Sequence, residues 1–75
     1  MIDLYVMETC PFCKRVMDFM EQTHIEYNKK DVSNSENHRR LMELGGKDQV
    51  PFMVDENTSM YESNDIVEYL KNKIA

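Results

Sequence analysis

Residues 2–22, IDLYVMETCPFCKRVMDFMEQ, set the architecture of this chain. In Ile2–Val6 the apolar side chains alternate with polar or amphipathic ones, which is typical of a β-strand. From Pro11 to about Gln22 the apolar side chains recur at helical spacing. Pro11 suits the first turn of a helix, because the N–H that it lacks would have no intrahelical partner there. The segment therefore predicts a strand that leads through a short loop into a helix.

Two cysteines, Cys10 and Cys13, fall at the junction of this strand and this helix. Cys10 is expected at the helix start and Cys13 one turn further in. The unpaired N–H groups and the positive dipole end of a helix start favour a thiolate over a thiol. Two thiols at this spacing either cycle between dithiol and disulfide or hold a metal ion. Their place at a helix start favours redox chemistry.

Length and composition predict one small domain, residues 1–75, in which a modest core buries roughly 60% of the unfolded surface. Hydrophobic residues make up 41% and charged residues 31%, which is ordinary for a folded globular chain. The net charge of −5 argues against a nucleic-acid partner. No apolar run reaches the ~18–20 residues that cross a bilayer, and no signal peptide precedes the first strand. We therefore expect a cytoplasmic monomer with no membrane partner.

The middle of the chain predicts a second strand and a second helix. Ile25–Lys29 resumes the two-residue period of a strand. Ser33 and Glu36 have the spacing of a capping box, which predicts Ser33 as the N-cap of the next helix. Leu41 and Leu44 are expected to face inward, and Gly45-Gly46 is expected to end the helix.

The remaining residues predict a hairpin and a final helix. Val50–Val54 is strand-like apart from its proline, and Thr58–Tyr61 can return beside it after a turn. Ser63 is expected to cap a helix from Asn64 to about Asn72. The order β-α-β-α-β-β-α predicts an α/β fold, with a mixed four-stranded sheet flanked by helices on both faces. Cys10 then falls at the carboxyl end of the first strand, where open α/β sheets place their sites.

Three motifs together resemble a known family. Cys10-Pro11-Phe12-Cys13, Val50-Pro51 and the segment Glu62–Leu70 resemble a glutaredoxin of the dithiol type, which has the thioredoxin fold. The resemblance spans essentially the whole chain and implies a single glutaredoxin-like domain. It implies a glutathione-dependent thiol–disulfide oxidoreductase that reduces protein disulfides and glutathione mixed disulfides. It also implies glutathione as co-substrate, no permanently bound cofactor and no metal site.

The resemblance assigns unequal roles to the two thiols. Cys10 would attack a disulfide sulfur, and Cys13 would resolve the mixed disulfide that forms. Phe12, between the cysteines, is expected to be exposed and to contact the substrate. Lys14, one turn beyond Cys10, would support the thiolate, although Glu8 would oppose it.

The other two motifs would form a glutathione site. In the resembled family the bond before Pro51 is cis, and the Val50 backbone holds the cysteinyl part of glutathione by strand-like hydrogen bonds. Backbone N–H groups of Ser63 and Asn64 would bind the α-carboxylate of the γ-glutamyl group. An acidic side chain, Asp65 or Glu62, would pair with its ammonium group.

The chain departs from the family in three places. Many glutaredoxins have Lys or Arg where this chain has Met7, so a contact to the glycine carboxylate of glutathione is missing unless Arg39, Arg40 or Lys14 replaces it. Gln49 stands where the family often has Thr. Tyr61-Glu62 replaces a usual Gly-Gly, and Glu62-Ser63 instead resembles the thioredoxin-like half of glutathione transferases.

Other functions remain open on the sequence alone. A related redoxin would take electrons from thioredoxin reductase and give them to ribonucleotide reductase, but such proteins usually have a different signature at Tyr61–Asn64. A copper-handling chaperone has Met-x-Cys-x-x-Cys, and Met7 is one residue too early for that pattern. Bridging of an iron–sulfur cluster by Cys10 is disfavoured by the proline that follows it.

Overall fold

The sheet of this protein is mixed, with strand order β2-β1-β3-β4. The computed structural model describes residues 1–75. Strand β1 pairs in parallel with β2 and antiparallel with β3, which in turn pairs antiparallel with β4. The elements along the chain are β1 (Ile2–Val6), α1 (Pro11–Gln22), β2 (Tyr27–Asp31), α2 (Ser35–Gly45), β3 (Phe52–Asp55), β4 (Thr58–Met60) and α3 (Ser63–Ile74). The order and the mixed four-stranded sheet predicted from the sequence are confirmed.

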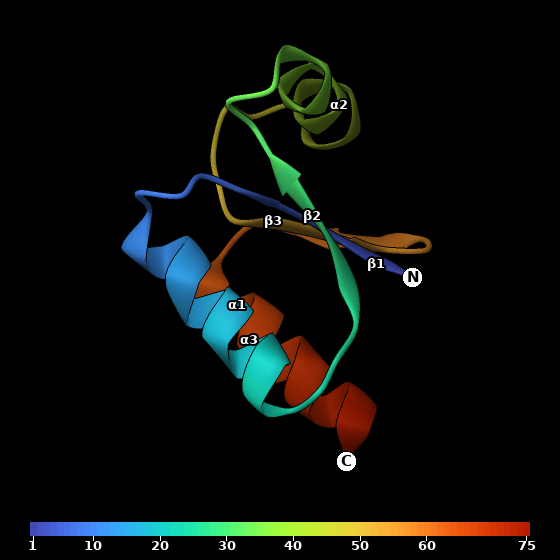
Figure 1. Ribbon diagram of the computed structural model, residues 1–75. Helices are drawn as coiled ribbons and strands as arrows, with labels where there is room; N and C mark the ends of the chain where they lie inside the picture. The colour runs from blue at the N-terminus through green and yellow to red at the C-terminus, as the bar shows by residue number, and fades with distance from the viewer.

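Helices cover both faces of the sheet. Helices α1 and α3 lie side by side on one face, and α2 lies on the other (Figure 1). The alternation along β1 explains this arrangement, because Leu4 and Val6 face one layer while Tyr5 faces the other. None of the three helices is both long and apolar enough to span a membrane.

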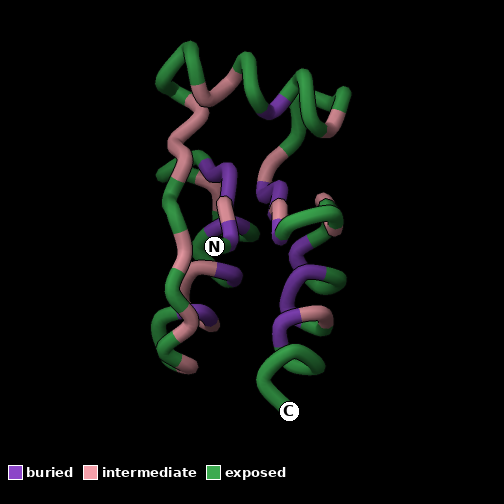
Figure 2. The backbone as a smooth tube through the Cα atoms, turned by 90° about the vertical axis from the view of Figure 1, so that its right-hand side faces the viewer, coloured by how far each residue is buried: buried purple, intermediate pink, exposed green.

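The larger core cluster lies between the sheet and the α1–α3 layer. Its ten buried residues are Ile2, Leu4, Val6, Cys13, Val16, Met20, Met53, Ile66, Val67 and Leu70. Figure 2 shows how buried positions alternate with exposed ones along α3. A smaller cluster on the α2 face joins Tyr5, Leu41 and Phe52. Cys13 is thus part of the main core as well as of the thiol pair.

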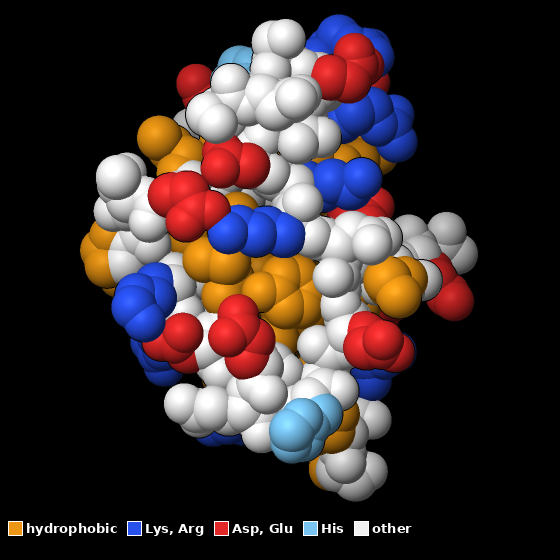
Figure 3. Space-filling view, in the orientation of Figure 1, with side chains coloured by type: hydrophobic (Ala, Val, Ile, Leu, Met, Phe, Trp, Pro, Cys, Tyr) orange, Lys and Arg blue, Asp and Glu red, His pale blue; other side chains and the backbone are white.

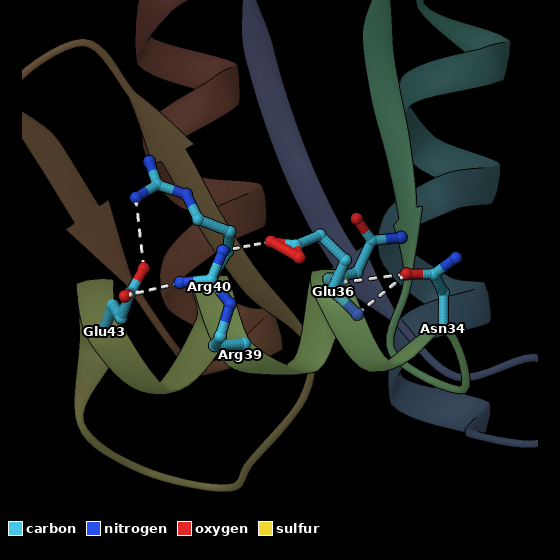
Figure 4. Close-up of polar contacts among 6 residues, drawn as sticks. Asn34, Glu36, Arg39, Arg40 and Glu43 are labelled. Carbon is cyan, nitrogen blue, oxygen red and sulfur yellow. Dashed lines mark hydrogen bonds and ion pairs between the residues drawn. The ribbon is translucent and has the colours of Figure 1, made fainter.

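The predicted N-caps of α2 and α3 are both wrong by one residue. Helix α2 is capped by Asn34, whose side-chain oxygen accepts hydrogen bonds from the N–H groups of Glu36 (2.9 Å) and Asn37 (3.1 Å) (Figure 4). The Ser33 N–H donates to Asp31 Oδ1 (2.9 Å) in the preceding turn, so it does not make the reciprocal bond to Glu36 that a capping box needs. Helix α3 begins at Ser63, so Glu62 is the N-cap, and it makes no side-chain capping bond.

Some predicted boundaries and inward positions also differ. Strand β2 begins at Tyr27 rather than Ile25, because the turn that closes α1 continues to Ile25, whose N–H donates to Met20 C=O (2.8 Å). Strand β3 begins after Pro51, and α3 continues to Ile74. Leu41 of α2 is fully buried, as predicted, but Leu44 is 41% exposed and does not face inward. The end of α2 at Gly45-Gly46 is confirmed, with Gly46 as a left-handed C-cap at φ 80°.

Candidate functional site

The thiol of Cys10 lies at the start of α1. Cys10 is the N-cap of this helix, and its Sγ accepts a hydrogen bond from the Cys13 N–H at 3.4 Å. Pro11 occupies the first turn, as the sequence predicts. Both cysteines are free thiols, and Cys10 is half-buried whereas Cys13 is fully buried. A donor N–H therefore points at the sulfur of the more accessible thiol, where it stabilises negative charge.

The buried thiol of Cys13 is difficult to ionise. Burial raises the pKa of Cys13 to about 12, because a thiolate there would lose its hydration. A backbone hydrogen bond from Met7 opposes this increase, and contact with the Cys10 thiol adds to it. Cys13 is consequently a neutral thiol at neutral pH and is a poor nucleophile until it loses its proton.

A cleft of about 380 Å³ lies beside this helix start. Phe12, which is 61% exposed, forms part of its wall, together with residues from the loop before β3 and from the start of α3. The Val50–Pro51 peptide bond is cis, as the family resemblance implied. The lining residues are Phe12, Gln49, Val50, Pro51, Tyr61, Glu62, Ser63 and Asn64. The structure thus brings residues of all three sequence motifs into one cleft.

The start of α3 gives this cleft a set of backbone N–H groups that have no partner within the helix. The first intrahelical backbone bond runs from the Ile66 N–H to the Glu62 C=O (2.9 Å). The N–H groups of Ser63, Asn64 and Asp65 therefore have no acceptor within the helix. These groups and the helix dipole make the α3 end of the cleft attractive to an anion.

Five of the predicted site residues are not among those that line this cleft. Both thiols, Cys10 and Cys13, are among the five. Asp65 lies in the first turn of α3 without contributing to the wall. Lys14 pairs with Asp18 (2.9 Å) and lines a separate groove between α1 and α3. Arg40 lies on α2 and pairs with Glu43 (3.3 Å), which also binds Arg39 (Figure 4).

Sequence reasoning missed side chains that tie the walls of the cleft together. Gln49 Nε2 donates to Glu62 Oε2 at 2.8 Å, which links the loop before β3 to the N-cap of α3. Arg15 on α1 donates to the Asn64 side chain at the start of α3. Both contacts join residues that are far apart in sequence, so no local sequence pattern predicts them. The only sequence signal was the unusual residue type at Gln49 and at Tyr61-Glu62.

Charges of both signs are mixed over one face of the molecule (Figure 3). Glu8, expected to oppose the thiolate, forms an ion pair with Lys29. Figure 3 shows a hydrophobic patch near the centre of one face with acidic and basic side chains around it. That face carries no broad basic surface.

Solved structures show that the fold is thioredoxin-like. A mutant form of a thioredoxin-like protein has a TM-score of 0.85 and 21% sequence identity, and the match covers 100% of both chains. A glutaredoxin from Archaeoglobus fulgidus has a TM-score of 0.80 and 23% identity, over 97% of this chain and 84% of the glutaredoxin. Identities this low establish the fold alone.

Glutathione transferases are similar over a shorter part of their length. Glutathione transferase Omega 3C from Trametes versicolor has a TM-score of 0.87 and 25% identity, over 97% of this chain and 33% of the transferase. The chain thus spans about a third of that transferase. No curated protein matches the chain. The family model for the glutathione S-transferase N-terminal domain matches residues 4–75, nearly the whole sequence. The chain therefore belongs to the family of glutathione S-transferase N-terminal domains.

Proposed function

We propose that this protein is a glutathione-dependent thiol–disulfide oxidoreductase of the dithiol glutaredoxin type. One observation carries the proposal: the Cys10 sulfur caps α1, and Phe12, two residues further on, lines a cleft together with Val50-Pro51 and the start of α3. An attacking thiol and a surface for an extended peptide with an anionic end are thus adjacent. Glutathione, a short peptide with a thiol and two carboxylates, has the chemistry that such a cleft fits.

The proposed reaction begins with attack by the Cys10 thiolate. Its sulfur forms a bond to the glutathione sulfur of a mixed disulfide, and the substrate leaves as a thiolate that takes a proton from water. The glutathione now linked to Cys10 lies in the cleft, with its cysteinyl backbone along Val50 and its γ-glutamyl carboxylate at Ser63 and Asn64. A second glutathione thiolate then attacks the bound glutathione sulfur. This step releases glutathione disulfide and restores the Cys10 thiolate.

Cys13 offers a second way to resolve the intermediate. Its thiolate attacks the Cys10 sulfur, displaces glutathione and leaves a Cys10–Cys13 disulfide, which two glutathione molecules then reduce. Because its pKa is raised to about 12, this route is slow at neutral pH. The route through a second glutathione therefore carries most of the turnover of small mixed disulfides. Attack by Cys13 serves the reduction of protein disulfides.

The proposal is tested with the mixed disulfide of glutathione and mercaptoethanol, in an assay coupled to glutathione reductase. Cys10→Ser is expected to reduce the rate to the uncatalysed background, whereas Cys13→Ser keeps a large part of it. Circular dichroism of both variants confirms that they are folded. Full activity of Cys10→Ser would contradict the proposal.

The electron donor needs a separate measurement. We expect glutathione with glutathione reductase to reduce the oxidised protein faster than thioredoxin reductase does. Reduction by thioredoxin reductase alone would favour the redoxin that serves ribonucleotide reductase. The copper chaperone is disfavoured, because the element order here is β-α-β-α-β-β-α and a proline, Pro11, follows Cys10 at the start of α1.

A second candidate function is glutathione transfer to an electrophile, which the family match favours. In that reaction the glutathione thiolate bonds to carbon and displaces a leaving group such as halide. Cys10 weighs against it as the main activity, since a thiol at this place exchanges with disulfides. A halogenated nitrobenzene as substrate separates the two functions: turnover of this compound that persists in Cys10→Ser would identify a transferase.

A further inference from the structure

The first turn of α3 offers the cleft both backbone donors and a buried hydroxyl. The N–H groups of Ser63 and Asn64 have no acceptor within the helix, because its first bond runs from the Ile66 N–H. Ser63 is only 9% exposed and lines the cleft, and its side chain makes no hydrogen bond to the rest of the protein. The start of α3 therefore has more donors than the chain itself uses.

Two acceptor side chains of the protein lie next to these free donors. Glu62 is the N-cap of α3, and Asn64 is the second residue of the helix. A carboxylate is attracted to the positive end of a helix dipole, and an asparagine amide oxygen readily accepts from nearby backbone N–H groups. Both side chains are thus internal competitors for an anionic ligand at this place.

Each competitor is held by a donor from another element. Gln49 Nε2 donates to Glu62 Oε2 at 2.8 Å, and Glu62 makes no capping bond to α3. Arg15 Nη1, on α1, donates to Asn64 Oδ1. Because both acceptors are bonded elsewhere, the free N–H groups at the start of α3 stay available.

The contact with Arg15 also decides which end of the Asn64 amide is free. A guanidinium group has donors only, so the amide oxygen has to face it. The amide NH2 group is the end that remains, and it makes no hydrogen bond of its own within the protein. At the cleft wall, Asn64 therefore offers donors and no free acceptor.

Arg15 is free to hold this amide because it has no acidic partner. Five other basic side chains form ion pairs with Asp or Glu, namely Lys14, Lys29, Arg39, Arg40 and Lys73. Arg15 forms none, and its guanidinium group bonds instead to a neutral amide 49 positions further along the chain. The same helix has the Cys10 thiol at its N-cap, so the contact joins the helix of the attacking thiol to the start of α3.

We infer that Arg15 is a positioning residue for the γ-glutamyl carboxylate of glutathione. By binding the Asn64 amide oxygen, it keeps that acceptor off the free N–H groups of α3 and leaves them, with the amide NH2 group, to the carboxylate. Arg15 acts through Asn64 and does not itself contact the ligand. The inference rests on the proposed function, because it takes glutathione as the ligand.

The test compares glutathione with 4-aminobutyryl-cysteinylglycine, which lacks the α-carboxylate and keeps the ammonium group. Dissociation constants of both ligands are measured by NMR titration of the reduced protein. Arg15→Met is expected to weaken glutathione binding about fivefold, because the ligand then competes with a capping bond of ordinary strength. Binding of the analogue should not change. Lys71→Met, which removes a lysine without an ion-pair partner from the groove that Arg15 also lines, is the matched control and should change neither constant.

A double-mutant cycle with Asn64→Ala separates positioning from simple attraction by charge. Alanine has no amide oxygen to compete for the N–H groups, so adding Arg15→Met to Asn64→Ala should leave glutathione binding unchanged. Direct attraction of the ligand by the guanidinium charge would give the same loss in both backgrounds. Arg15→Lys keeps a charged donor and should recover most of the affinity. Circular dichroism confirms that the variants are folded.

Three results would overturn the inference and leave the proposed exchange at Cys10 standing. They are unchanged glutathione binding in Arg15→Met, an equal loss of binding for glutathione and the analogue, or a loss of the same size in the Asn64→Ala background. Absence of any glutathione binding by the wild-type protein, together with no turnover of the glutathione mixed disulfide, would remove the proposed function and the inference together.

Discussion

The two cysteines have the same chemistry and unequal surroundings. Cys10 is half-buried at a helix start, while Cys13 belongs to the main core. The sequence predicted that Cys10 lies at the helix start, among free N–H groups, and Cys13 one turn further in, and the family resemblance gave the two thiols unequal roles. It could not predict how completely Cys13 is buried, because that depends on contacts with α3 and the sheet.

Closure of the Cys10–Cys13 disulfide is expected to depend steeply on pH. Burial, the largest cause of the raised pKa of Cys13, persists when Cys10 carries glutathione. The reactive thiolate fraction of Cys13 then rises about tenfold per pH unit below its pKa of about 12. Stopped-flow release of glutathione from the preformed mixed disulfide should therefore accelerate about tenfold from pH 7 to 8. A rate independent of pH in this range would show that Cys13 ionises readily.

Gly45→Ala is expected to destabilise the protein despite the higher helix propensity of alanine. The propensity gain is about 1 kcal/mol, whereas the clash of Cβ with the Tyr61 hydroxyl costs about 2–3 kcal/mol. Urea unfolding should show a net loss of about 1–2 kcal/mol in the free energy of unfolding, together with weaker glutathione binding. Gly46→Ala is the control: it has open space and φ 80°, so it should reduce stability without affecting binding.

At the scale of elements, most of the helices and strands follow from local patterns, and the caps do not. The capping-box rule favoured Ser33, but the Ser33 N–H bonds to the Asp31 side chain, and Asn34 is the N-cap of α2. At α3, the Glu62 side chain bonds to Gln49 instead of capping the helix. Each cap is decided by a competing hydrogen bond that the local motif does not contain.

Asn34→Ala and Ser33→Ala separate the observed cap from the predicted one. Asn34→Ala removes both side-chain bonds to the first turn of α2 and should lower the free energy of unfolding by about 1 kcal/mol. Ser33→Ala should change it by less than about half that amount, because Ser33 is exposed and does not cap α2. Chemical denaturation measures both. The reverse order of effects would mean that Ser33 caps the helix in solution.

The side-chain hydrogen bonds that link the segments around the cleft cannot be predicted from local sequence patterns. Gln49–Glu62 and Lys47–Tyr61 join residues 13 and 14 positions apart, and Arg15–Asn64 joins residues 49 apart. The family resemblance indicated that the three motifs share a site. Some polar side chains are hydrogen-bonded to their neighbours, and others remain free for a ligand. This division depends on the packed structure.

At the scale of the whole molecule, a second polar cluster joins the β3–β4 hairpin to the last turns of α3. Asp55, only 8% exposed, accepts a hydrogen bond from the Tyr69 hydroxyl (2.8 Å) and pairs with Lys73 (3.0 Å). The hydrogen bond from Tyr69 and the contact with Lys73 hold the pKa of Asp55 below its ordinary value of 3.8. The ionised carboxylate therefore stabilises the fold.

Acid is expected to weaken this cluster. Because the folded pKa of Asp55 is depressed, its contribution is complete above the unfolded value of 3.8 and is lost as pH falls through the folded pKa. Thermal unfolding from pH 5 to pH 2 should show a falling melting temperature in wild-type protein. Asp55→Asn should unfold at a lower temperature at pH 5 and show a shallower decline, and equal slopes would contradict the assignment.

The outer strands of the sheet have a consequence for behaviour at high concentration. Strand β2 borders the sheet with the run Tyr-Asn-Lys-Lys-Asp, and β4 on the opposite border has only three residues. A second copy that tried to extend the sheet at β2 would bring lysines against lysines, or at β4 would find a very short partner. The two border strands therefore give protection against sheet extension between copies, and light scattering at millimolar concentration should not rise with time. Replacing Lys29 and Lys30 with threonine should remove that protection.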